Sequence, residues 1–516
     1  MVWARTEVDG IPAYWADGDG DLKAHLIFRV GTADEQLAVS GITHLIEHLA
    51  LFAVKGQAHT VNGQVDATTT VFAVKGDPQE VVEFLTGVCG ALRSLPFDRL
   101  QVENRILRAE ANDRAPALLE PLLLWRYGAA TYGVSSYEEF GVGRHTPDQI
   151  SAWVERWFTR DNAVLVFMGG PPPESLRLDL PAGERIPPPA PSSALPVTPA
   201  YFTEPLQHTV AANAVVGRSV PAQAYTMLLG RRLEKKLRME LGISYSPAAS
   251  YNVRDADVAH VTAFADGLPE NHAELVSAFV FHFRLTAEEA ASGQEIADIV
   301  DRLRTAKRDS PSGTAYGNAL RELFGREPIS DRDHAASLAA VDPEAVREVG
   351  VEALRSALLM TPGWELPGAR FHPAPWTSAD AVDGQVLRSA DAPVDGERLV
   401  IGPAGVSLVQ SPSRRVTVRF PECEAMLAWP DGARRLIGRD GFSLLIEPTL
   451  WIGGSSLTAR LDEAIPADRV VPRPRRSSDR IPKPKASRYQ RVRARLTRDR
   501  AAGAAPTRRT GGGDAD

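Results

Sequence analysis

The sequence predicts an α+β protein with two duplicated α+β halves, then a small antiparallel β domain and a disordered basic tail. Strand-like and helix-like patterns alternate over the first 360 residues, which is typical of a mixed α+β chain. The order of strand, turn and helix in residues 68–89 also recurs in residues 258–280, where Pro78 and Pro269 are 191 residues apart. This recurrence is the first indication that one unit has been duplicated.

A second pair of landmarks supports the duplication. Residues 342–360 repeat the pattern that begins at Thr146, and Pro343 lies 196 residues after Pro147. Two nearly equal offsets favour a repeated unit of roughly 190 residues. The alternative is that helices opened by proline are common in proteins and that the two pairs are unrelated.

The elements of the first half follow from local patterns. Residues 22–30 alternate with period two and predict a strand, and apolar residues at helical spacing after Ser40 predict a helix. Residues 69–76 are β-branched or aromatic and end at glycine, as strands do. Asp77 and Pro78 provide the cap and the first turn of the next helix. Further helices are predicted from Asp98 to about 114 and from Thr146, and a further strand at 162–170.

Changes in composition suggest the domain boundaries. The segment around 186–199 is rich in proline and serine, which is typical of an extended linker. After about residue 367, short strands are separated by Pro-Ala-Gly, Pro-Asp-Gly and Arg-Asp-Gly turns, and the last residues lack apolar periodicity. The predicted segments are an α+β domain at 1–185, a linker at 186–199, a second α+β domain at 200–366, a linker at 367–395, a β domain at 396–470 and a basic tail at 471–516.

Composition restricts the class of protein. Apolar residues make up 44% of the chain and charged residues 24%, which is ordinary for a globular protein. Only two cysteines are present, too few for a disulfide framework, which favours a reducing compartment. No signal peptide is predicted at the first residues, and no apolar stretch reaches the ~20 residues of a membrane span. A soluble cytoplasmic protein is therefore expected.

Charge is unevenly distributed along the chain. Residues 469–516 contain 15 Lys and Arg against 4 Asp and Glu, a net charge of +11. Because the whole chain carries −7, residues 1–468 carry −18. The basic tail contains few aromatic residues to stack on bases, so it is predicted to be solvated and not to bind nucleic acid.

A group of histidines and a glutamate indicates chemistry in the helix after Ser40. His44 and His48 are four residues apart, so both imidazoles lie on one helix face and can bind one metal ion. Glu47 lies beside them and can accept a proton from a water molecule, which is the general base that a metal-dependent hydrolase needs. The alternative is a solvated face, which the apolar neighbours Leu45 and Leu49 disfavour.

A catalytic zinc site needs a third protein ligand and an open fourth position. Glu103 and Glu110 are seven residues apart on the next predicted helix and therefore face the same way. Glu110 is predicted as the third ligand, and Glu103 as a carboxylate that holds an imidazole in place. Alone this pair is a weak indication, because acidic residues on helices are usually solvated.

These residues resemble the motif of a known peptidase family. The stretch GTADEQLAVSGITHLIEHLALF is similar to that of the insulinase, pitrilysin and mitochondrial processing peptidase family, in which His-x-x-Glu-His is followed by Glu-x6-Glu. The resemblance covers residues 15 to about 360. It implies one Zn²⁺ per chain bound by His44, His48 and Glu110, with Glu47 as the base, and duplicated α+β halves.

A second motif of that family occurs in the second half. The family carries an arginine and a tyrosine seven residues apart, and LRMELGISYS supplies Arg238 and Tyr245. The resemblance implies that they stabilise the tetrahedral intermediate and hold the peptide carbonyl, since guanidinium and phenol groups donate to an oxyanion. A tyrosine in this context is otherwise an ordinary strand residue.

The strand that pairs with substrate in the family differs here. Family members often read Asn-Ala-aromatic-Thr, whereas this chain has Asp66, Ala67 and Thr68, followed by another threonine. Substrate is still expected to add to this edge through main-chain hydrogen bonds, which tolerate side-chain changes. The acid at Asp66 and the negative charge of residues 1–468 suggest a preference for basic peptides.

The predicted function is a zinc-dependent endopeptidase that hydrolyses short or unfolded peptides. The alternative is a catalytically inactive scaffold or peptide-binding homologue, although none of the expected ligands is lost. The resemblance also implies a clamshell of two chains, a homodimer or a heterodimer with a homologous chain. In such a clamshell Arg238 and Tyr245 serve the zinc site of the partner, so Tyr245 is expected to lie far from His44 within one chain.

Overall fold

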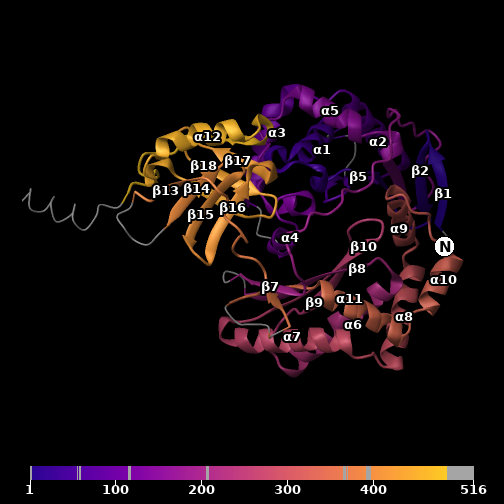
Figure 1. Ribbon diagram of the computed structural model, residues 1–516. Coiled ribbons are helices and arrows are strands. Elements are labelled where there is room, and N and C mark those ends of the chain that lie inside the picture. The colour runs from indigo at the N-terminus through magenta and orange to yellow at the C-terminus, as the bar shows by residue number, and fades with distance from the viewer. Residues whose placement is uncertain are drawn as a thin grey trace, which may run out of the picture. The chain divides into compact units, whose positions relative to one another are not determined.

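The computed structural model describes residues 3–484 apart from 55, 57–59, 114–117, 205–207, 364–367, 369 and 391–396. Its contacts divide the chain into two compact units (Figure 1). The first unit comprises Met1–Pro375 with Arg439–Gly441, and the second comprises Trp376–Gly438 and the residues from Phe442 onward. The first unit contains both predicted halves and the candidate site.

The first half is built on one six-stranded sheet with the order β1-β2-β6-β3-β5-β4. Its strands are β1 (Trp3–Val8), β2 (Ile11–Ala16), β3 (Leu22–Phe28), β4 (Thr60–Val65), β5 (Thr70–Gly76) and β6 (Ala163–Met168). Its helices are α1 (Ile42–Ala53), α2 (Pro78–Arg93), α3 (Leu100–Asp113), α4 (Leu119–Tyr127) and α5 (Pro147–Trp157).

The second half is built on a six-stranded sheet with the order β12-β7-β11-β8-β10-β9. Its strands are β7 (Ala200–Thr203), β8 (Thr209–Gly217), β9 (Ala248–Val253), β10 (Val258–Asp266), β11 (Leu358–Thr361) and β12 (His372–Pro373). Its helices are α6 (Val220–Leu233), α7 (His272–Glu288), α8 (Gly293–Asp309), α9 (Pro311–Leu323), α10 (Asp331–Ala339) and α11 (Pro343–Ser356).

The two sheets have the same topology over five strands. In the first, β2 is parallel to β6, and β6, β3, β5 and β4 follow in antiparallel order. In the second, β7 is parallel to β11, and β11, β8, β10 and β9 follow in the same way. The predicted α+β class is confirmed, and the matched strand order is what duplication of the chain would produce.

The outer strands differ between the halves. β1 precedes its neighbour in the chain and pairs with β2 in antiparallel register. β12 comes at the end of the second half and pairs with β7 in parallel register. The duplication therefore extends over five adjacent strands of each sheet, from β2 to β4 and from β7 to β9, and the sixth strand beside β2 or β7 comes from a different segment.

Two helices are exchanged between the halves. α4 belongs to the first half by sequence, yet its Leu122 packs against the second sheet, in a cluster with Phe202 and Met360. α9 belongs to the second half, yet its buried residues Ala315 and Leu323 pack against the first sheet. Since each half supplies a helix that covers the other half's sheet, neither sheet is completely buried by its own segment.

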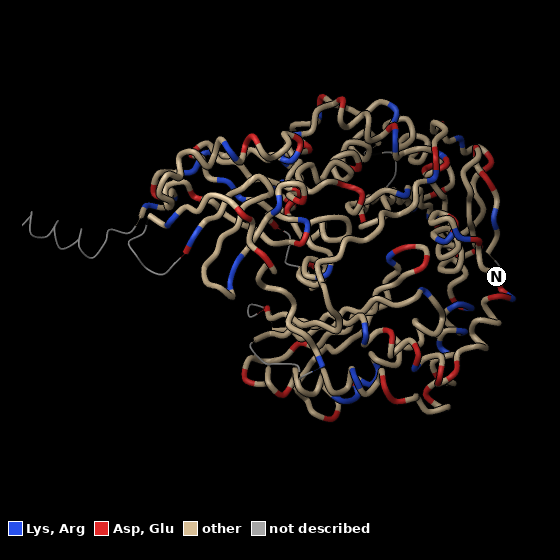
Figure 2. Tube along the Cα trace, in the orientation of Figure 1, with Lys and Arg blue, Asp and Glu red and all other residues tan. Residues whose placement is uncertain are grey.

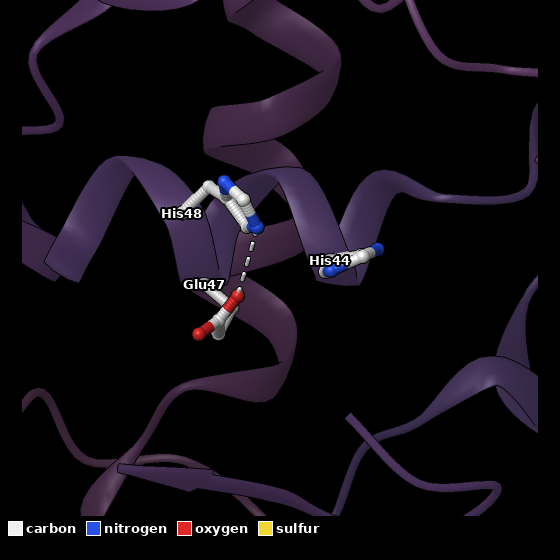
Figure 3. A group of neighbouring side chains, drawn as sticks. All are labelled: His44, Glu47 and His48. Carbon is white, nitrogen blue, oxygen red and sulfur yellow. Dashed lines mark ion pairs between the residues drawn. The ribbon is translucent and has the colours of Figure 1, made fainter. Parts of the chain in front are cut away.

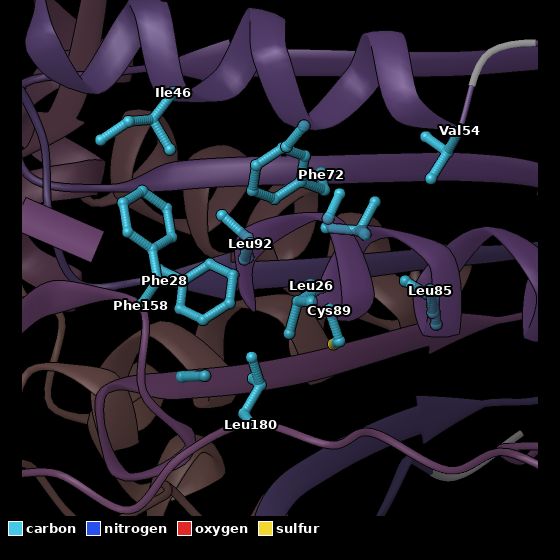
Figure 4. Close-up of a cluster of buried hydrophobic side chains, with 14 of the residues drawn as sticks. Leu26, Phe28, Ile46, Val54, Phe72, Leu85, Cys89, Leu92, Phe158 and Leu180 are labelled. Carbon is cyan, nitrogen blue, oxygen red and sulfur yellow. The ribbon is translucent and has the colours of Figure 1, made fainter. Parts of the chain in front are cut away.

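The core of the first half shows why the strands alternate. Leu26, Phe28 and Phe72 point to the face covered by α1, α2 and α5 (Figure 4). The intervening residues, such as Ile27 and Val71, point to the opposite face, which α9 covers. Both faces are apolar, so these strands are buried on two sides, and residues at successive positions serve different helices.

The helix starts follow the predicted capping chemistry, with one exception. Asp77 accepts hydrogen bonds from the amides of Gln79 and Glu80, and α2 begins at Pro78 as predicted. α3 begins at Leu100, after a 3₁₀ turn at Phe97–Arg99 that contains Asp98. The predicted helix start at Asp98 is therefore wrong by two residues, because the chain makes this turn before the α-helix begins.

The described residues of the second unit form two four-stranded sheets and one α-helix, with the strand orders β13-β14-β15-β16 and β19-β18-β17-β20. Its elements are β13 (Gln385–Arg388), β14 (Arg398–Gly402), β15 (Gly405–Ser411), β16 (Arg414–Arg419), β17 (Cys423–Ala428), β18 (Arg434–Gly438), β19 (Ser443–Ile446), α12 (Leu457–Ala464) and β20 (Val470–Pro472). A shared apolar core joins both sheets to α12, with Val406, Met426 and Leu461 fully buried.

This unit extends beyond the predicted β domain at both ends. β13 lies inside the segment predicted as the 367–395 linker, and β20 extends past residue 470. Arg476, in the predicted tail, forms ion pairs with Asp431 and Glu447. The remainder of the predicted tail, residues 485–516, lies outside the described residues.

Acidic and basic residues are interleaved over the first unit, as the red and blue segments of Figure 2 show. Among the described residues, none of the helices is both long and apolar enough to cross a bilayer.

Candidate metal centre

The start of helix α1 is fixed by contacts with several neighbouring residues. Its N-cap, Gly41, has φ +91°, a left-handed conformation that favours glycine. A Cβ at this position would also lie 2.8 Å from side-chain atoms of Glu139 and Val142. The buried carboxylate of Glu35 accepts hydrogen bonds from the amides of Gly41, at 2.7 Å, and Thr43, at 2.9 Å. These contacts fix the first turn of the helix immediately before His44.

The two predicted histidines lie one turn apart on the same side of α1 (Figure 3). The ring centroids of His44 and His48 are 4.9 Å apart, with the ring planes at 80°. Glu47 projects from the same helix, and its Oε2 is 3.7 Å from Nε2 of His48. One ligand atom from each of the three residues lies within 4.8 Å of the others, so α1 alone supplies a compact donor group.

Glu110 completes this group from a different helix. Its Oε2 lies 3.8 Å from Nε2 of His44 and 3.5 Å from Nε2 of His48. The seven-residue spacing on α3 therefore brings Glu110 to the histidines, as the sequence predicted, while Glu103 lies two turns earlier on the same helix. About half of the Glu110 side chain is exposed, so solvent reaches the centre from this side.

The donor set fits zinc. Tetrahedral zinc with bonds of about 2.0–2.1 Å places its ligand atoms roughly 3.3 Å apart. The distances of 3.5 and 3.8 Å from Glu110 to the two Nε2 atoms are close to this value. Two imidazole nitrogens and one carboxylate are also the ligand combination of several catalytic zinc sites, which leave a fourth position open.

Each imidazole has a carboxylate on its other nitrogen. Nδ1 of His48 lies 3.4 Å from Oε2 of Glu103, whose second oxygen accepts from Arg99 at 3.0 Å. This is the supporting position that the sequence predicted for Glu103. Nδ1 of His44 lies 2.9 Å from Oε1 of Glu139. Glu139 is not predicted from the sequence, because it lies 95 residues from His44 in a loop with no motif spacing.

Burial and charge set the proton affinities of the centre. Burial of the Glu47 carboxylate raises its pKa, with His48 and His44 opposing this and Glu110 and Glu103 adding to it. Burial disfavours a charged His44, but the hydrogen bond and charge of Glu139, with the charges of Glu47 and Glu110, outweigh it and raise the pKa of His44. A divalent cation would oppose both effects, because it favours ionised carboxylates and neutral imidazoles.

The edge of the first sheet lies over Glu47. β4 is the outermost strand, and among the described residues it pairs only with β5. A Cβ at Gly63 of β4 would overlap Oε1 of Glu47. Only 5% of Glu47 is exposed, so the strand edge and the candidate base are in direct contact.

Residues 66–68 do not offer the free edge that was predicted for substrate. The carbonyl of Asp66 accepts from the amide of Thr32, and that of Ala67 from the amide of Ala33. The carbonyl of Thr68 accepts from Nη1 of Arg29 at 3.3 Å, and the residue is buried. The main-chain acceptors of all three are therefore engaged within the chain, and the unpaired edge lies earlier, on β4.

Arg238 and Tyr245 form a pair of their own. Arg238 lies in a π-helical turn, Glu234–Glu240, with its guanidinium 5.2 Å from the centre of the Tyr245 ring. Its other partner is Glu234 at 3.6 Å, and Tyr245 is 76% exposed. Within the described part of the chain, no hydrogen bond, ion pair or ring contact joins this pair to His44, Glu47, His48 or Glu110.

Comparison of the sequence with family models and with curated proteins finds no match. Solved structures do match. A protease from Helicobacter pylori has a TM-score of 0.55 at 15% identity, covering 69% of this chain and 98% of its own. A peptidase M16 inactive domain from Pseudomonas fluorescens has a TM-score of 0.56 at 14% identity, covering 71% and 99%.

A chain of complex III from Candida albicans also matches, with a TM-score of 0.56 at 13% identity and coverage of 69% and 94%. The matched share of the present chain is about 70%. The chain therefore has the two-domain α+β fold of the M16, or insulinase-like, peptidases. Because the neighbours include both proteases and an inactive domain, the fold does not decide between an enzyme and a scaffold.

Proposed function

We propose that the chain is a zinc-dependent endopeptidase that hydrolyses peptide bonds of short or unfolded peptides. The observation that carries this proposal is the convergence of Glu110 Oε2 on the Nε2 atoms of His44 and His48, at 3.8 and 3.5 Å. Three donors from two helices meet here beside the buried carboxylate of Glu47. A solvated helix face would not need this convergence.

Each residue has a distinct part in the proposed reaction. His44, His48 and Glu110 would hold Zn²⁺, which supplies Lewis acidity to a water molecule and to the scissile carbonyl. Glu47 accepts a proton from the attacking water and later delivers it to the leaving amine. Its burial suits this part, because a raised pKa makes the carboxylate a stronger base. Glu103 accepts from the Nδ1 of His48 and so directs Nε2 toward the centre.

An extended peptide would bind at the edge of β4. Strand addition uses main-chain hydrogen bonds and therefore selects for unfolded segments more than for particular side chains. Gly63 of β4 lies against Glu47, so a peptide paired with this edge would be close to the proposed base. Asp66 directly follows this strand, and its side chain accepts a hydrogen bond from Gln64 at 2.7 Å. Because Asp66 is acidic and residues 1–468 carry a net charge of −18, basic peptides are the proposed substrates.

Arg238 and Tyr245 are proposed to act in a partner chain, within a clamshell of two copies or of this chain and a homologue. Their exposure and their lack of contact with His44 in the described residues support this arrangement. They would donate hydrogen bonds to the oxyanion of the partner's substrate. The cytoplasm is the proposed compartment, because Cys89 and Cys423 are both free and buried.

The competing proposal is an inactive scaffold, which the matched inactive domain supports. A zinc assay combined with peptide cleavage separates the two. The enzyme is expected to bind about one zinc per chain, to cleave a mixed peptide library and to lose cleavage with a chelator. Glu47→Gln should retain zinc and reduce kcat by about 10²–10⁴-fold. Zinc binding without cleavage of any peptide, and no effect of Glu47→Gln, would favour the scaffold.

A further inference from the structure

Nδ1 of His44 lies closer to its carboxylate partner than Nδ1 of His48 does, and the partner of His44 forms no ion pair with an arginine among the described residues. The Oε1 atom of Glu139 is 2.9 Å from Nδ1 of His44, whereas Glu103 is 3.4 Å from Nδ1 of His48. Glu103 also forms an ion pair with Arg99, which partly neutralises the negative charge of Glu103. In the described part of the chain, His44 is the single ion-pair partner of Glu139.

A neutral imidazole has one N–H donor and one acceptor nitrogen, and a strong acceptor at one nitrogen decides which is which. With Glu139 accepting at Nδ1, the proton of His44 is held there. The lone pair is then on Nε2, which is the atom that faces Glu110 at 3.8 Å. The contact therefore selects both the tautomer and the direction of the ring.

The loop that carries Glu139 is fixed to the start of α1. The amide of Phe140 donates to Oγ of Ser40 at 3.0 Å, and the amide of Gly141 donates to the carbonyl of Ser40 at 2.9 Å. Arg144 donates to the carbonyl of Ala38 at 2.9 Å. Glu139 is consequently held against the first turn of α1, and its Cβ packs where Gly41 lacks a side chain.

The same loop is also attached to the helix that carries Glu110. The amide of Gly143 donates to Oδ1 of Asn104 at 2.7 Å, and Arg108 donates to the carbonyl of Val142 at 3.2 Å. Asn104 and Arg108 both belong to α3, the helix of Glu110. The loop 137–145 therefore joins the two helices that supply the metal donors, and Glu139 immediately precedes these attachments.

We propose that Glu139 is a positioning residue that holds His44 in the metal-binding tautomer and orientation. This inference rests on the proposed zinc centre and adds a part that the motif spacing does not contain. Glu139 does not contact the metal; it acts through His44, as Glu103 acts through His48. The two imidazoles are thus oriented by carboxylates from two different segments, the loop 137–145 and α3.

Zinc affinity, measured by competition with a chromophoric chelator, tests the proposal without relying on activity. Glu139→Ala is expected to weaken zinc binding by about 10–100-fold. Glu139→Gln should retain most of the affinity, because its amide oxygen still accepts from Nδ1–H. The matched control is Glu138→Ala at the exposed neighbouring position, which should bind zinc as the unaltered protein does. His44→Ala should abolish binding.

Nitrogen NMR of His44 in the metal-free protein gives a second readout. Above the pKa of His44, the unaltered protein should show the proton on Nδ1, and Glu139→Ala should shift it toward Nε2. If His44→Ala abolishes zinc binding while Glu139→Ala leaves affinity and tautomer unchanged, the positioning part is wrong and the zinc centre stands. If the unaltered protein binds no zinc, the proposed function is wrong. If NMR of the unaltered protein shows the proton on Nε2 of His44, the proposed role of Glu139 is also wrong. If Glu139→Ala does not fold, the tautomer of the unaltered protein still decides.

Discussion

Gly63 of β4 leaves the space that the carboxylate of Glu47 occupies. A Cβ at Gly63 would overlap Oε1 of Glu47, and the neighbouring Cγ would also be too close. The backbone of Gly63 adopts an ordinary strand conformation, so glycine is required here by the close approach and not by φ. The edge strand and the candidate base therefore constrain each other.

Gly63→Ala is expected to displace Glu47 and to reduce kcat by on the order of 100-fold, because a general base must lie within hydrogen-bond reach of its proton. Zinc affinity should change little, since Glu47 is not a ligand. Gly90→Ala is the matched control, because nothing lies within 4 Å of a Cβ at this exposed position of α2. That control should keep full activity and gain about 0.5–1 kcal/mol in unfolding free energy. Full activity of Gly63→Ala would contradict the assigned base.

Glu110→Ala is expected to remove one of three protein ligands and to weaken zinc binding by several orders of magnitude, measured by chelator competition. Its side chain is half exposed, so the free energy of unfolding of the metal-free protein should change by less than about 0.5 kcal/mol. Asp113→Asn on the same helix is the control, because this exposed carboxylate lies near the end of α3. Equal zinc affinity in the two variants would exclude Glu110 as a ligand.

The parts of the site that the sequence predicted are those fixed by helix geometry. His44 and His48 share a face because they are four residues apart, and Glu110 faces them from α3, one seven-residue interval after Glu103. The helix start at Pro78 could also be predicted, because the cap residue Asp77 hydrogen-bonds to amides only two and three residues further along the chain. Such features depend on neighbours within one or two turns, which a sequence displays directly.

The parts that the sequence did not reveal depend on tertiary contacts. Glu139 reaches His44 only because its loop is attached to α1 and α3. Apolar residues predict that a helix buries one face, but they do not show which sheet that face covers. α4 of the first half covers the second sheet, and α9 of the second half covers the first sheet. The carbonyls of Asp66 and Ala67 are engaged because the glycine at position 31 admits their backbone, and no strand pattern indicates this.

Acid–base behaviour provides a test of the capping carboxylate at the start of α1. Burial of Glu35 raises its pKa to about 7, against the hydrogen bonds from Gly41 and Thr43. A carboxyl group whose folded pKa exceeds its unfolded value binds more protons when folded. Its contribution to the free energy of unfolding is therefore largest below about pH 4.5 and decreases as the pH rises through about 7.

Glu35→Gln removes this titration. The amide can accept from only one of the two backbone amides, so the variant is expected to be about 1–3 kcal/mol less stable at pH 4.5. The difference should shrink between pH 4.5 and 7, because only the unaltered protein then bears the cost of a buried charge. Denaturant unfolding across this range measures the difference, with Glu83→Gln on the exposed face of α2 as the control substitution. A difference that grows with pH would contradict the raised pKa.

The exchange of helices between the halves predicts that they unfold together. Arg126 of α4 is buried and has no acidic partner within the described part of the chain, and burial lowers its pKa to about 10. Its guanidinium donates to Oδ1 and the carbonyl of Asn213 on β8 and to the carbonyl of Ser356 at the end of α11. Arg126→Leu leaves these acceptors without their donor, which is expected to cost about 3–5 kcal/mol. Because α4 belongs to one half and Asn213 to the other, both sheets should lose stability equally. Hydrogen exchange of β3 and β8 amides measures this loss.

Arg105→Leu, at an exposed position of α3, is the control and should leave the exchange of both strands unchanged. Loss of protection in β8 alone after Arg126→Leu would show that the two halves unfold independently.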